Sequence, residues 1–221
     1  MIGHYIDNTN LKSYSTYADI VQLCEEAKLY DMAAVCVLPC RVRLASDLLR
    51  NSGVKVCTVV GFPLGGDITA TKLYATRQAL LDGADEIDIV IDNGAVKDGN
   101  YNLVENELKI ISRLKREYDF NLKVIVETAL LSEVELITLT RIISNLECDY
   151  IKTSTGFSTR GVTIEDINII KQHKSPVLKI KASGGIRTYA WAKELIDLGV
   201  ERIGTSSAVL IINEGQNGED Y

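Results

Sequence analysis

The chain alternates short apolar segments, rich in β-branched residues, with longer stretches whose apolar residues recur every three or four positions. The short segments are typical of buried strands, and the longer pattern is typical of amphipathic helices. Within residues 132–146 the apolar positions are Val134, Ile137, Leu139, Ile142, Ile143 and Leu146. The pattern predicts strands over residues 4–6, 33–37, 55–60, 86–91, 123–127, 150–153, 177–182 and 202–204.

Eight strands that each precede a helix predict a parallel sheet, because crossover helices bury both faces of such a sheet. Eight units in 221 residues fit a closed (β/α)8 TIM barrel, an α/β fold. The alternative, an open doubly wound sheet, usually carries a GxGxxG turn after its first strand. Here DNTNLK follows that strand, so the barrel is favoured. We expect a single catalytic domain over 1–212 and a flexible tail over 213–221.

Charge, apolar runs and cysteine spacing argue against several classes of binding partner. The chain has 24 Lys and Arg residues against 30 Asp and Glu residues, a net charge of −6, and no basic run, so nucleic-acid binding is not expected. No apolar run approaches the roughly 20 residues of a membrane span, and the first residues do not resemble a signal peptide. Five cysteines without a CxxC pair favour buried thiols over a zinc cluster. We therefore expect a cytoplasmic protein with no nucleic-acid or membrane partner.

Charged side chains lie in or directly after several predicted strands. Buried charges cost several kcal/mol each unless they are paired or shift their pKa, and catalytic side chains of such barrels lie at the carboxyl ends of strands. The charged residues at these positions are Asp7, Asp88, Glu127, Lys152, Lys179 and Lys181. This concentration predicts an active site. For Glu127 alone, a strand-end cap or a lysine partner is the simpler interpretation.

Two lysines on consecutive predicted strands carry the main hypothesis. Lys152 alternates with the apolar Ile151, so its amine faces the barrel interior, and the same alternation turns Lys181 inward. Adjacent strands lie about 4.8 Å apart, so burial and mutual repulsion should lower the pKa of at least one lysine of the pair. A neutral amine is the nucleophile that forms a Schiff base with a carbonyl. The alternative interpretation is two lysines that extend to solvent.

Asp88 also faces inward, because Ile87 and Ile89 lie on the opposite face of its strand. On its own such a carboxylate is a salt-bridge partner. Beside two lysines it is a candidate catalytic residue that donates and accepts a proton. Cys36, at the end of the second predicted strand, is interpreted as a buried structural thiol.

Three loops after the last three predicted strands combine glycine with hydroxyl side chains. Glycine lets the backbone approach an anion, and hydroxyls and helix N-termini supply hydrogen-bond donors. Barrels of this kind frequently bind phosphate at the loops after the seventh and eighth strands. The candidate substrate-binding residues are Thr155, Gly156, Gly184, Gly185, Gly204, Ser206 and Ser207. The loops predict a small phosphorylated carbonyl compound as substrate.

Segments along nearly the whole chain resemble the deoxyribose-phosphate aldolases, a family of class I aldolases. These segments are YIDNTNLK, AAVCVLP, VVGFPLGG, GADEIDIVI, VIVETALL, YIKTSTGF, KASGGIRT and RIGTSS, between residues 5 and 207. The resemblance implies that Lys152 forms the Schiff base, that Lys181 tunes its reactivity and that Asp88 transfers protons. It also implies a set of residues that bind the substrate phosphate, namely Gly184, Gly185, Gly204, Ser206 and Ser207.

The implied reaction is the reversible aldol cleavage of 2-deoxy-D-ribose 5-phosphate to acetaldehyde and D-glyceraldehyde 3-phosphate. No metal or organic cofactor is expected, because a protonated imine supplies the charge that a metal would supply. The partner is the phosphorylated sugar, and a homodimer is the candidate assembly. Two other functions remain open. A phosphosugar isomerase or epimerase would need a general base and often a metal, and a non-catalytic phosphosugar-binding protein would not need paired lysines.

Three positions depart from the family pattern. Asn8 stands where histidine is usual, and Leu38 stands where asparagine is usual. Lys179 replaces a small residue, so it is expected to add a third cation to the barrel interior. At the C-terminus, Tyr221 is a candidate for proton transfer at the enamine carbon, because some family members end in tyrosine. The alternative is an exposed tyrosine without a role.

Overall fold

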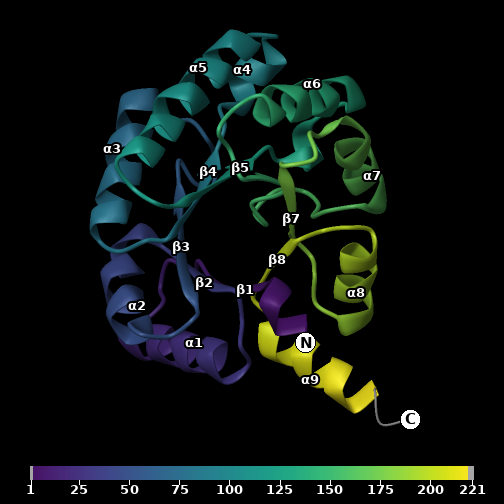
Figure 1. Cartoon of the computed structure of the whole chain (residues 1–221). Coiled ribbons are helices and arrows are strands. Elements are labelled where there is room, and N and C mark those ends of the chain that lie inside the picture. Colours follow the sequence, from purple (N-terminus) through teal and green to yellow (C-terminus); the bar gives the residue numbers. More distant parts are fainter. Residues whose placement is uncertain (1, 219–221) are drawn as a thin grey trace.

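A computed structural model describes residues 2–218 as one closed barrel of eight parallel strands (Figure 1). The strands pair in chain order, and the eighth strand pairs with the first to close the ring. They are β1 (Ile6–Asn10), β2 (Ala34–Val37), β3 (Lys55–Val60), β4 (Glu86–Val90), β5 (Asn121–Ile125), β6 (Tyr150–Lys152), β7 (Lys179–Ser183) and β8 (Arg202–Thr205). The predicted TIM barrel is confirmed.

Helices form a ring around the strands and cover the outer face of the barrel (Figure 1). Within residues 2–218 they are α1 (Tyr17–Leu29), α2 (Val42–Leu49), α3 (Thr69–Leu81), α4 (Asn93–Lys97), α5 (Tyr101–Ser112), α6 (Glu133–Ser144), α7 (Ile164–His173), α8 (Tyr189–Asp197) and α9 (Ala208–Gly218). Two of them, α4 and α5, follow β4. Each strand therefore leads into at least one helix, as the alternation in the sequence predicts.

Local sequence signals determine where helices begin and end. The side chains of Thr16, Ser132 and Thr163 each accept a hydrogen bond from the backbone three residues later, and an acidic side chain there accepts one from the cap residue. These capping boxes satisfy donors that the start of a helix leaves unpaired. Gly83 and Gly199 follow the ends of α3 and α8 with φ values of 99° and 95°. Glycine is favoured there because the conformation is left-handed.

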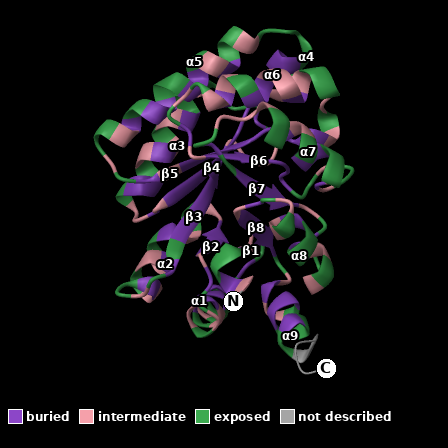
Figure 2. Ribbon diagram, turned by 45° about the vertical axis from the view of Figure 1, so that its right-hand side comes forward, coloured by how far each residue is buried: buried purple, intermediate pink, exposed green. Residues whose placement is uncertain are grey.

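The strands are buried on both faces (Figure 2). Outward side chains such as Ile87, Ile89 and Val124 belong to a continuous apolar core that they form with the helices. Burial of this aliphatic surface stabilises the fold. The inward face carries charges instead, and the charged side chains there that are at most 1% exposed are Asp7, Glu86, Asp88, Lys123 and Lys181. The apolar core thus surrounds a charged interior.

Two predicted boundaries are wrong. Residues 2–5 form a 3-10 turn, and β1 begins at Ile6, so Asp7 lies inside the strand and pairs with β8. The expected flexible tail from residue 213 is helical as far as Gly218, because α9 continues through it. The Tyr30 hydroxyl donates a hydrogen bond to Asn213 on this helix. Tyr221 lies outside the described residues.

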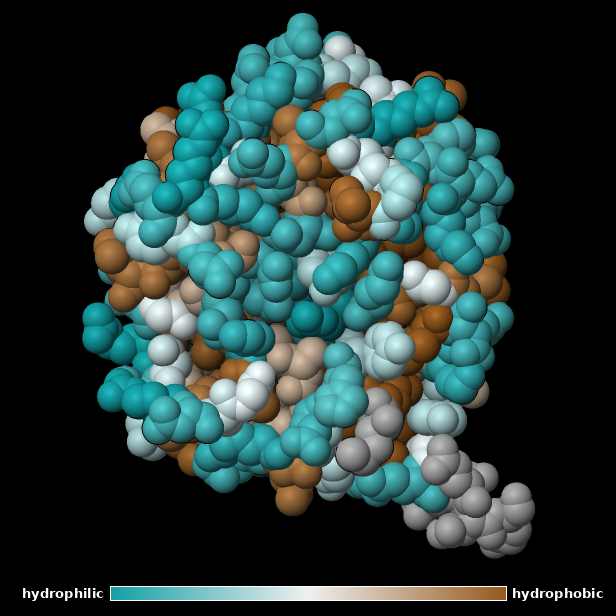
Figure 3. Space-filling view, in the orientation of Figure 1, coloured by the Kyte–Doolittle hydropathy of each residue, from teal (hydrophilic) through white to brown (hydrophobic). Residues whose placement is uncertain are grey.

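No helix in residues 2–218 is long and apolar enough to cross a bilayer. Figure 3 shows hydrophilic atoms over the centre of one face of the molecule, and hydrophobic atoms in smaller patches toward its edge. Exposed large hydrophobic side chains include Leu64, Tyr74 and Val177.

Candidate active site

A cavity of about 460 Å³ opens at the carboxyl ends of β1, β6, β7 and β8. This is the end of the barrel where the loops of such folds carry active sites. Its walls bring together most of the residues that the sequence selects, namely Lys152, Thr155, Gly156, Gly184, Gly185, Gly204 and Ser206. The cavity therefore joins the predicted nucleophile to the predicted phosphate loops.

Lys152, Asp88 and Lys181 meet inside the barrel at the base of this cavity. Lys152 on β6 lies opposite Lys181 on β7 in the parallel register. Each ammonium donates a hydrogen bond to Asp88 Oδ2 over 2.7 Å. Lys152 is 4% exposed, whereas Asp88 and Lys181 are 0% exposed. Of these three residues, Lys152 lines the cavity, Asp88 contacts Lys152, and Lys181 contacts Asp88.

The charges of Asp88 and Lys181 follow from their surroundings. Burial raises the pKa of Asp88, but three neighbouring ammonium groups together lower it by more than burial raises it. The net pKa therefore lies well below its usual range. Burial lowers the pKa of Lys181, but the carboxylates of Asp7 and Asp88 raise it, and the net pKa lies above its usual range. The lowered pKa expected for at least one lysine of the pair is therefore not found at Lys181. At neutral pH Asp88 is a carboxylate and Lys181 is an ammonium ion.

The third lysine inside the barrel is Lys123 on β5, which the sequence analysis does not select. Its Nζ lies 2.9 Å from Asp88 Oδ1 and 2.6 Å from Glu86 Oε2. Lys179, expected to be this third cation, is exposed at the amino-terminal end of β7, with its Nζ 5.5 Å from the centre of the Tyr150 ring. Lys123 and Asp88 are partners in the β4–β5 register. The alternation that turns Asp88 inward could therefore have found Lys123.

A second layer of ion pairs lies deeper in the barrel, toward the amino-terminal ends of the strands. Arg202 Nη1 on β8 lies 2.7 Å from Asp7 Oδ1 and 3.0 Å from Glu86 Oε2. Asp7 in turn accepts a hydrogen bond from the Lys181 ammonium. Burial raises the pKa of Asp7, but Lys181 and Arg202 lower it to a net value below its usual range. This layer holds Lys181 in place from below.

The phosphate loops have the backbone that an anion site needs. Gly156, Gly184 and Gly185 have φ values of 87°, 85° and 76°. Glycine adopts this left-handed conformation at low cost, and the turns it makes let backbone N–H groups converge on an anion. Ser206 lines the cavity, but Ser207 is not part of its wall, and the Ser207 N–H donates to Thr205 Oγ1 over 2.9 Å. A role for Ser207 in phosphate binding stays a prediction.

Two cationic side chains that the sequence analysis does not select also line the cavity. Lys12 follows β1, and Arg187 follows the glycine pair after β7. A cavity with both cations and a glycine-rich wall has the composition of a site for a phosphorylated ligand. Arg187 stands directly after the SGGI segment, so the glycine motif itself could have pointed to it.

Glu127 supports the loop that follows β6. It is 3% exposed and has a φ of 53°, and its Oε2 accepts hydrogen bonds from the backbone N–H and the hydroxyl of Thr155. Its Oε1 has no hydrogen-bond partner among the described residues. Glu127 is expected to cap a strand end or to pair with a lysine. In the structure it instead supports Thr155, which lines the cavity.

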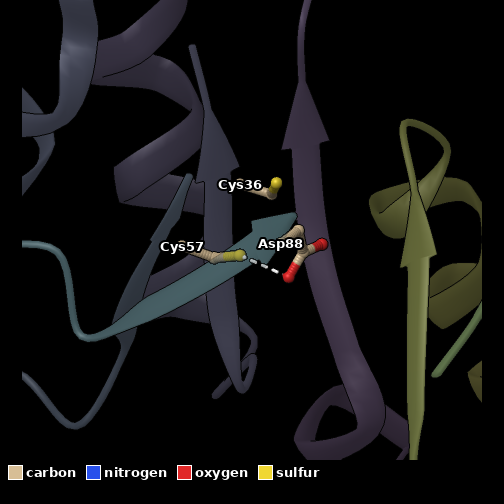
Figure 4. Close-up of side chains that lie close together, drawn as sticks. All are labelled: Cys36, Cys57 and Asp88. Carbon is tan, nitrogen blue, oxygen red and sulfur yellow. Dashed lines mark hydrogen bonds between the residues drawn. The ribbon is translucent and has the colours of Figure 1, made fainter. Parts of the chain in front are cut away.

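Two cysteine sulfurs approach the central carboxylate (Figure 4). Cys57 Sγ lies 3.1 Å from Asp88 Oδ1, and the ligand atoms of Cys36, Cys57 and Asp88 all lie within 4.8 Å of one another. Two sulfurs and a carboxylate suit a soft metal ion, but ammonium groups already contact both oxygens of Asp88 and would repel a cation. Among the five cysteines expected to be buried, Cys40 is exposed.

The arrangement can activate an amine. A lysine amine that gives its proton to a neighbouring base can attack a carbonyl carbon and form an imine. The Asp88 carboxylate is within hydrogen-bond reach of Lys152 and can accept that proton, and the Lys181 ammonium on the same oxygen can return one. The cavity that this amine lines is also lined by two cationic side chains and the glycine-rich loops.

Comparison with known proteins shows that the chain is similar to aldolases along nearly its whole length. The model of the DeoC/LacD family of aldolases matches residues 2–202. The deoxyribose-phosphate aldolase of Thermococcus gammatolerans is 46% identical over 220 residues, which cover 99% of this chain and 98% of that protein. The deoxyribose-phosphate aldolase of Caldicellulosiruptor saccharolyticus is 48% identical over 214 residues, which cover 96% of this chain and 97% of that protein.

Solved structures share the barrel. The structure described as "QR15, an Aldolase" is 40% identical, with a TM-score of 0.93 and coverage of 99% of this chain and 97% of that one. The deoxyribose phosphate aldolase from Aeropyrum pernix, described as tetrameric, is 31% identical, with a TM-score of 0.90 and coverage of 97% and 91%. The similarity therefore spans every strand that carries a candidate site residue.

Proposed function

The chain belongs to the DeoC/LacD family of aldolases, and we propose that it cleaves 2-deoxy-D-ribose 5-phosphate reversibly through a Schiff base on Lys152. The products are acetaldehyde and D-glyceraldehyde 3-phosphate. Curated relatives named deoxyribose-phosphate aldolase are 46–48% identical to it over nearly its whole length. They argue against an isomerase, an epimerase or a non-catalytic binding protein. The observation that carries the role of Lys152 is its position, because it both lines the cavity and contacts Asp88.

The first steps join Lys152 to the substrate. Asp88 Oδ2 lies 2.7 Å from the Lys152 amine and takes its proton, so that the nitrogen lone pair attacks the aldehyde carbon C1. The product is a carbinolamine. Its hydroxyl accepts a proton and leaves as water, which produces a protonated imine between Lys152 and the sugar. That proton is the one Asp88 took from Lys152, so Asp88 ends this step as a carboxylate that is still hydrogen-bonded to the Lys181 ammonium.

The protonated imine then withdraws electrons from the sugar chain. A proton leaves the C3 hydroxyl, the C2–C3 bond breaks, and its electron pair forms an enamine on Lys152 as D-glyceraldehyde 3-phosphate departs. Protonation of the enamine at C2 regenerates an imine, and water hydrolyses it to acetaldehyde and the lysine amine. Asp88 is the proposed acceptor of the hydroxyl proton. The positive charge of the imine serves as the electron sink, so these steps use no metal and no organic cofactor.

Reduction with borohydride in the presence of acetaldehyde tests the covalent step. The imine should be trapped as one ethyl group on Lys152, with irreversible loss of activity, and intact mass with peptide mapping should locate the group. Lys152→Ala should gain no ethyl group and should not cleave 2-deoxyribose 5-phosphate. Lys72→Met is the matched control, because Lys72 is a buried, ion-paired lysine outside the cavity. An unchanged mass, or an ethyl group on another lysine, would contradict the proposal.

The substrate phosphate is proposed to bind between Gly156, Gly184, Gly185, Gly204 and Ser206, with Lys12 and Arg187 as counter-ions. The variant Arg187→Met should raise the KM for 2-deoxyribose 5-phosphate by about tenfold or more, because a hydrogen bond to a charged group contributes about 1.5–3 kcal/mol. The KM for 2-deoxyribose without phosphate should not change. Arg43→Met, which removes an exposed arginine of α2, is the control. An equal rise for both sugars would place Arg187 outside the phosphate site.

The role of Tyr221 stays a prediction, because the residue lies outside the described part of the chain. Tyr221→Phe removes only the hydroxyl. If that hydroxyl protonates the enamine, exchange of the acetaldehyde methyl protons with deuterated water should slow severalfold, while trapping of the imine by borohydride persists. Equal exchange rates in the wild type and in Tyr221→Phe would show that the Tyr221 hydroxyl has no role in this proton transfer.

The assembly and the cellular location are also proposals. A homodimer remains the candidate assembly and can be checked by sedimentation, with the tetramer described for the Aeropyrum pernix relative as the competing result. A cytoplasmic location is supported by five cysteines that are all present as free thiols, because reducing compartments preserve thiols.

A further inference from the structure

Two cysteines lie side by side on neighbouring strands of the barrel. Cys36 on β2 and Cys57 on β3 are partners in the parallel register. Paired residues of adjacent strands are about 4.8 Å apart, within the range of about 4.4–6.8 Å between Cα atoms that a disulfide bridges. Their sulfur atoms lie within 4.8 Å of each other, and Figure 4 shows both side chains next to Asp88.

The pair is buried close to the cavity. Cys36 is 1% exposed and Cys57 is 0% exposed, and both belong to a small apolar cluster inside the barrel. Leu11 packs against this cluster and also lines the cavity. A small uncharged molecule that enters the cavity is therefore separated from the two sulfurs by apolar side chains and not by a layer of the sheet.

The surroundings make the two thiols unequal. A hydrogen bond from the Cys57 thiol lowers the pKa of Cys36, burial raises it and the charge of Lys181 lowers it again, so that the net pKa lies below the usual value. Burial raises the pKa of Cys57 well above the usual value, and its contacts with Cys36 and Asp88 raise it further. A thiolate is the reactive form of cysteine. Cys36 therefore has the character of the attacking sulfur, and Cys57 that of its partner.

We propose that Cys36 and Cys57 form a peroxide-sensitive thiol pair whose oxidation to a disulfide inactivates the enzyme. The Cys36 thiolate attacks one oxygen of hydrogen peroxide and becomes a sulfenic acid, and the other oxygen leaves as hydroxide. Cys57 then attacks the sulfenic sulfur, and water leaves as the disulfide forms. In total two thiols lose two hydrogens and one peroxide becomes two waters. A dithiol reductant reverses the change by thiol–disulfide exchange.

Inactivation follows from the second contact that Cys57 makes. Its sulfur lies 3.1 Å from Asp88 Oδ1 and 3.2 Å from the Lys123 ammonium. A disulfide of about 2.0 Å turns this sulfur toward Cys36 and removes it from both partners. Asp88 is the group that contacts the Lys152 amine. A displacement of about 1 Å at reacting groups costs about 10²-fold in rate, and this part of the inference rests on the proposed function of Asp88.

The test treats the reduced, native enzyme with hydrogen peroxide and removes the excess with catalase. Intact mass and peptide mapping without reductant should then show the loss of two hydrogens and a bond between Cys36 and Cys57. Cleavage of 2-deoxyribose 5-phosphate should fall by about 10²-fold. Dithiothreitol should restore both the mass and the rate.

Variants separate this pair from other thiols. Cys36→Ala and Cys57→Ala, each compared with its own untreated rate, should retain activity in peroxide. Cys40→Ser removes an exposed thiol and should leave the sensitivity of the wild type. The proposal is wrong if no Cys36–Cys57 bond forms, if the bonded enzyme keeps its rate, or if Cys36→Ala is inactivated as fast as the wild type. An untreated enzyme without aldolase activity would count against the proposed function, and the mass measurement would still decide whether the disulfide forms.

Discussion

The molecule contains two sets of buried lysines, one in the helix layer and one inside the barrel. In the helix layer, Lys72 on α3 is 0% exposed and donates hydrogen bonds to Glu107 Oε1 over 2.7 Å and to the Val90 carbonyl over 2.9 Å. It is one cation with one carboxylate. Inside the barrel, Lys123, Lys152 and Lys181 share the single carboxylate of Asp88.

The two sets differ in whether a cavity reaches the lysine amine and in whether several ammonium groups share one carboxylate. Lys72 is enclosed, and a Cβ added at Gly61 would come within 2.9 Å of its Cε. Lys152 opens into a cavity, and its carboxylate is also bound to a second ammonium. A buried, paired lysine is therefore structural when nothing can reach it. It becomes a candidate nucleophile when a cavity reaches its amine and a shared carboxylate can take its proton.

Loss of the shared carboxylate should have the largest effect. Asp88→Asn removes the proposed proton acceptor, and kcat for cleavage should fall by about 10²–10⁴-fold. The matched variant in the helix layer, Glu107→Gln, should keep the wild-type kcat on folded protein. Steady-state rates of both variants, normalised to the folded fraction, give the comparison. Equal losses in the two variants would mean that the barrel carboxylate is only structural.

Loss of the second ammonium should have a smaller effect with a distinctive pH dependence. Lys181 stays charged at neutral pH, and a neighbouring positive charge favours the neutral form of an amine. Lys181→Leu should therefore move the pH–rate profile to higher pH and lower kcat near neutral pH by about tenfold. Lys181→Arg, which keeps the charge, should leave the profile near its original position. A profile that does not move in Lys181→Leu would show that the two lysines act independently.

Loss of the helix-layer lysine should affect stability and leave turnover unchanged. Lys72→Met leaves the Glu107 carboxylate buried without its partner, which typically costs about 3–5 kcal/mol. Urea unfolding should show this loss in the midpoint, and kcat per folded molecule should equal that of the wild type. A variant that keeps its stability but loses kcat would remove the distinction between the two sets.

The smallest expected difference between the two regions is in how the free energy of unfolding depends on pH. Because the pKa of Asp88 is lowered, its contribution to the stability of the fold is present above about pH 4 and is lost only below that pH. Because the pKa of Lys181 is raised, its contribution to stability is present below about pH 10. The barrel set should therefore contribute a constant amount across neutral pH. Burial raises the pKa of Glu107, so its contribution falls as the pH rises through that raised value. In Glu107→Gln, the midpoint of thermal unfolding should therefore depend less on pH between about pH 4 and pH 7.

Much of the candidate site could be predicted from short stretches of sequence. Alternation within a strand places Lys152, Lys181 and Asp88 on the inner face, because side chains of a strand alternate between its two faces. The structure has all three there. The same reasoning failed for Lys179, because alternation gives the face of a residue but not its height along the barrel. Lys179 is the first residue of β7 and reaches solvent at the amino-terminal end.

By itself the sequence determined the barrel, the inward-facing residues and the glycine-rich loops, because each depends on residues that are near one another in the chain. Only the tertiary structure decided which lysine reaches the cavity, why Lys181 is charged and which cations line the cavity beside it. Those properties depend on contacts between distant segments, such as the bonds from Lys181 to Asp7 and to Asp88, residues that are 174 and 93 positions away. A charge state is set by the sum of burial and of all nearby charges, and that sum exists only once the barrel has closed.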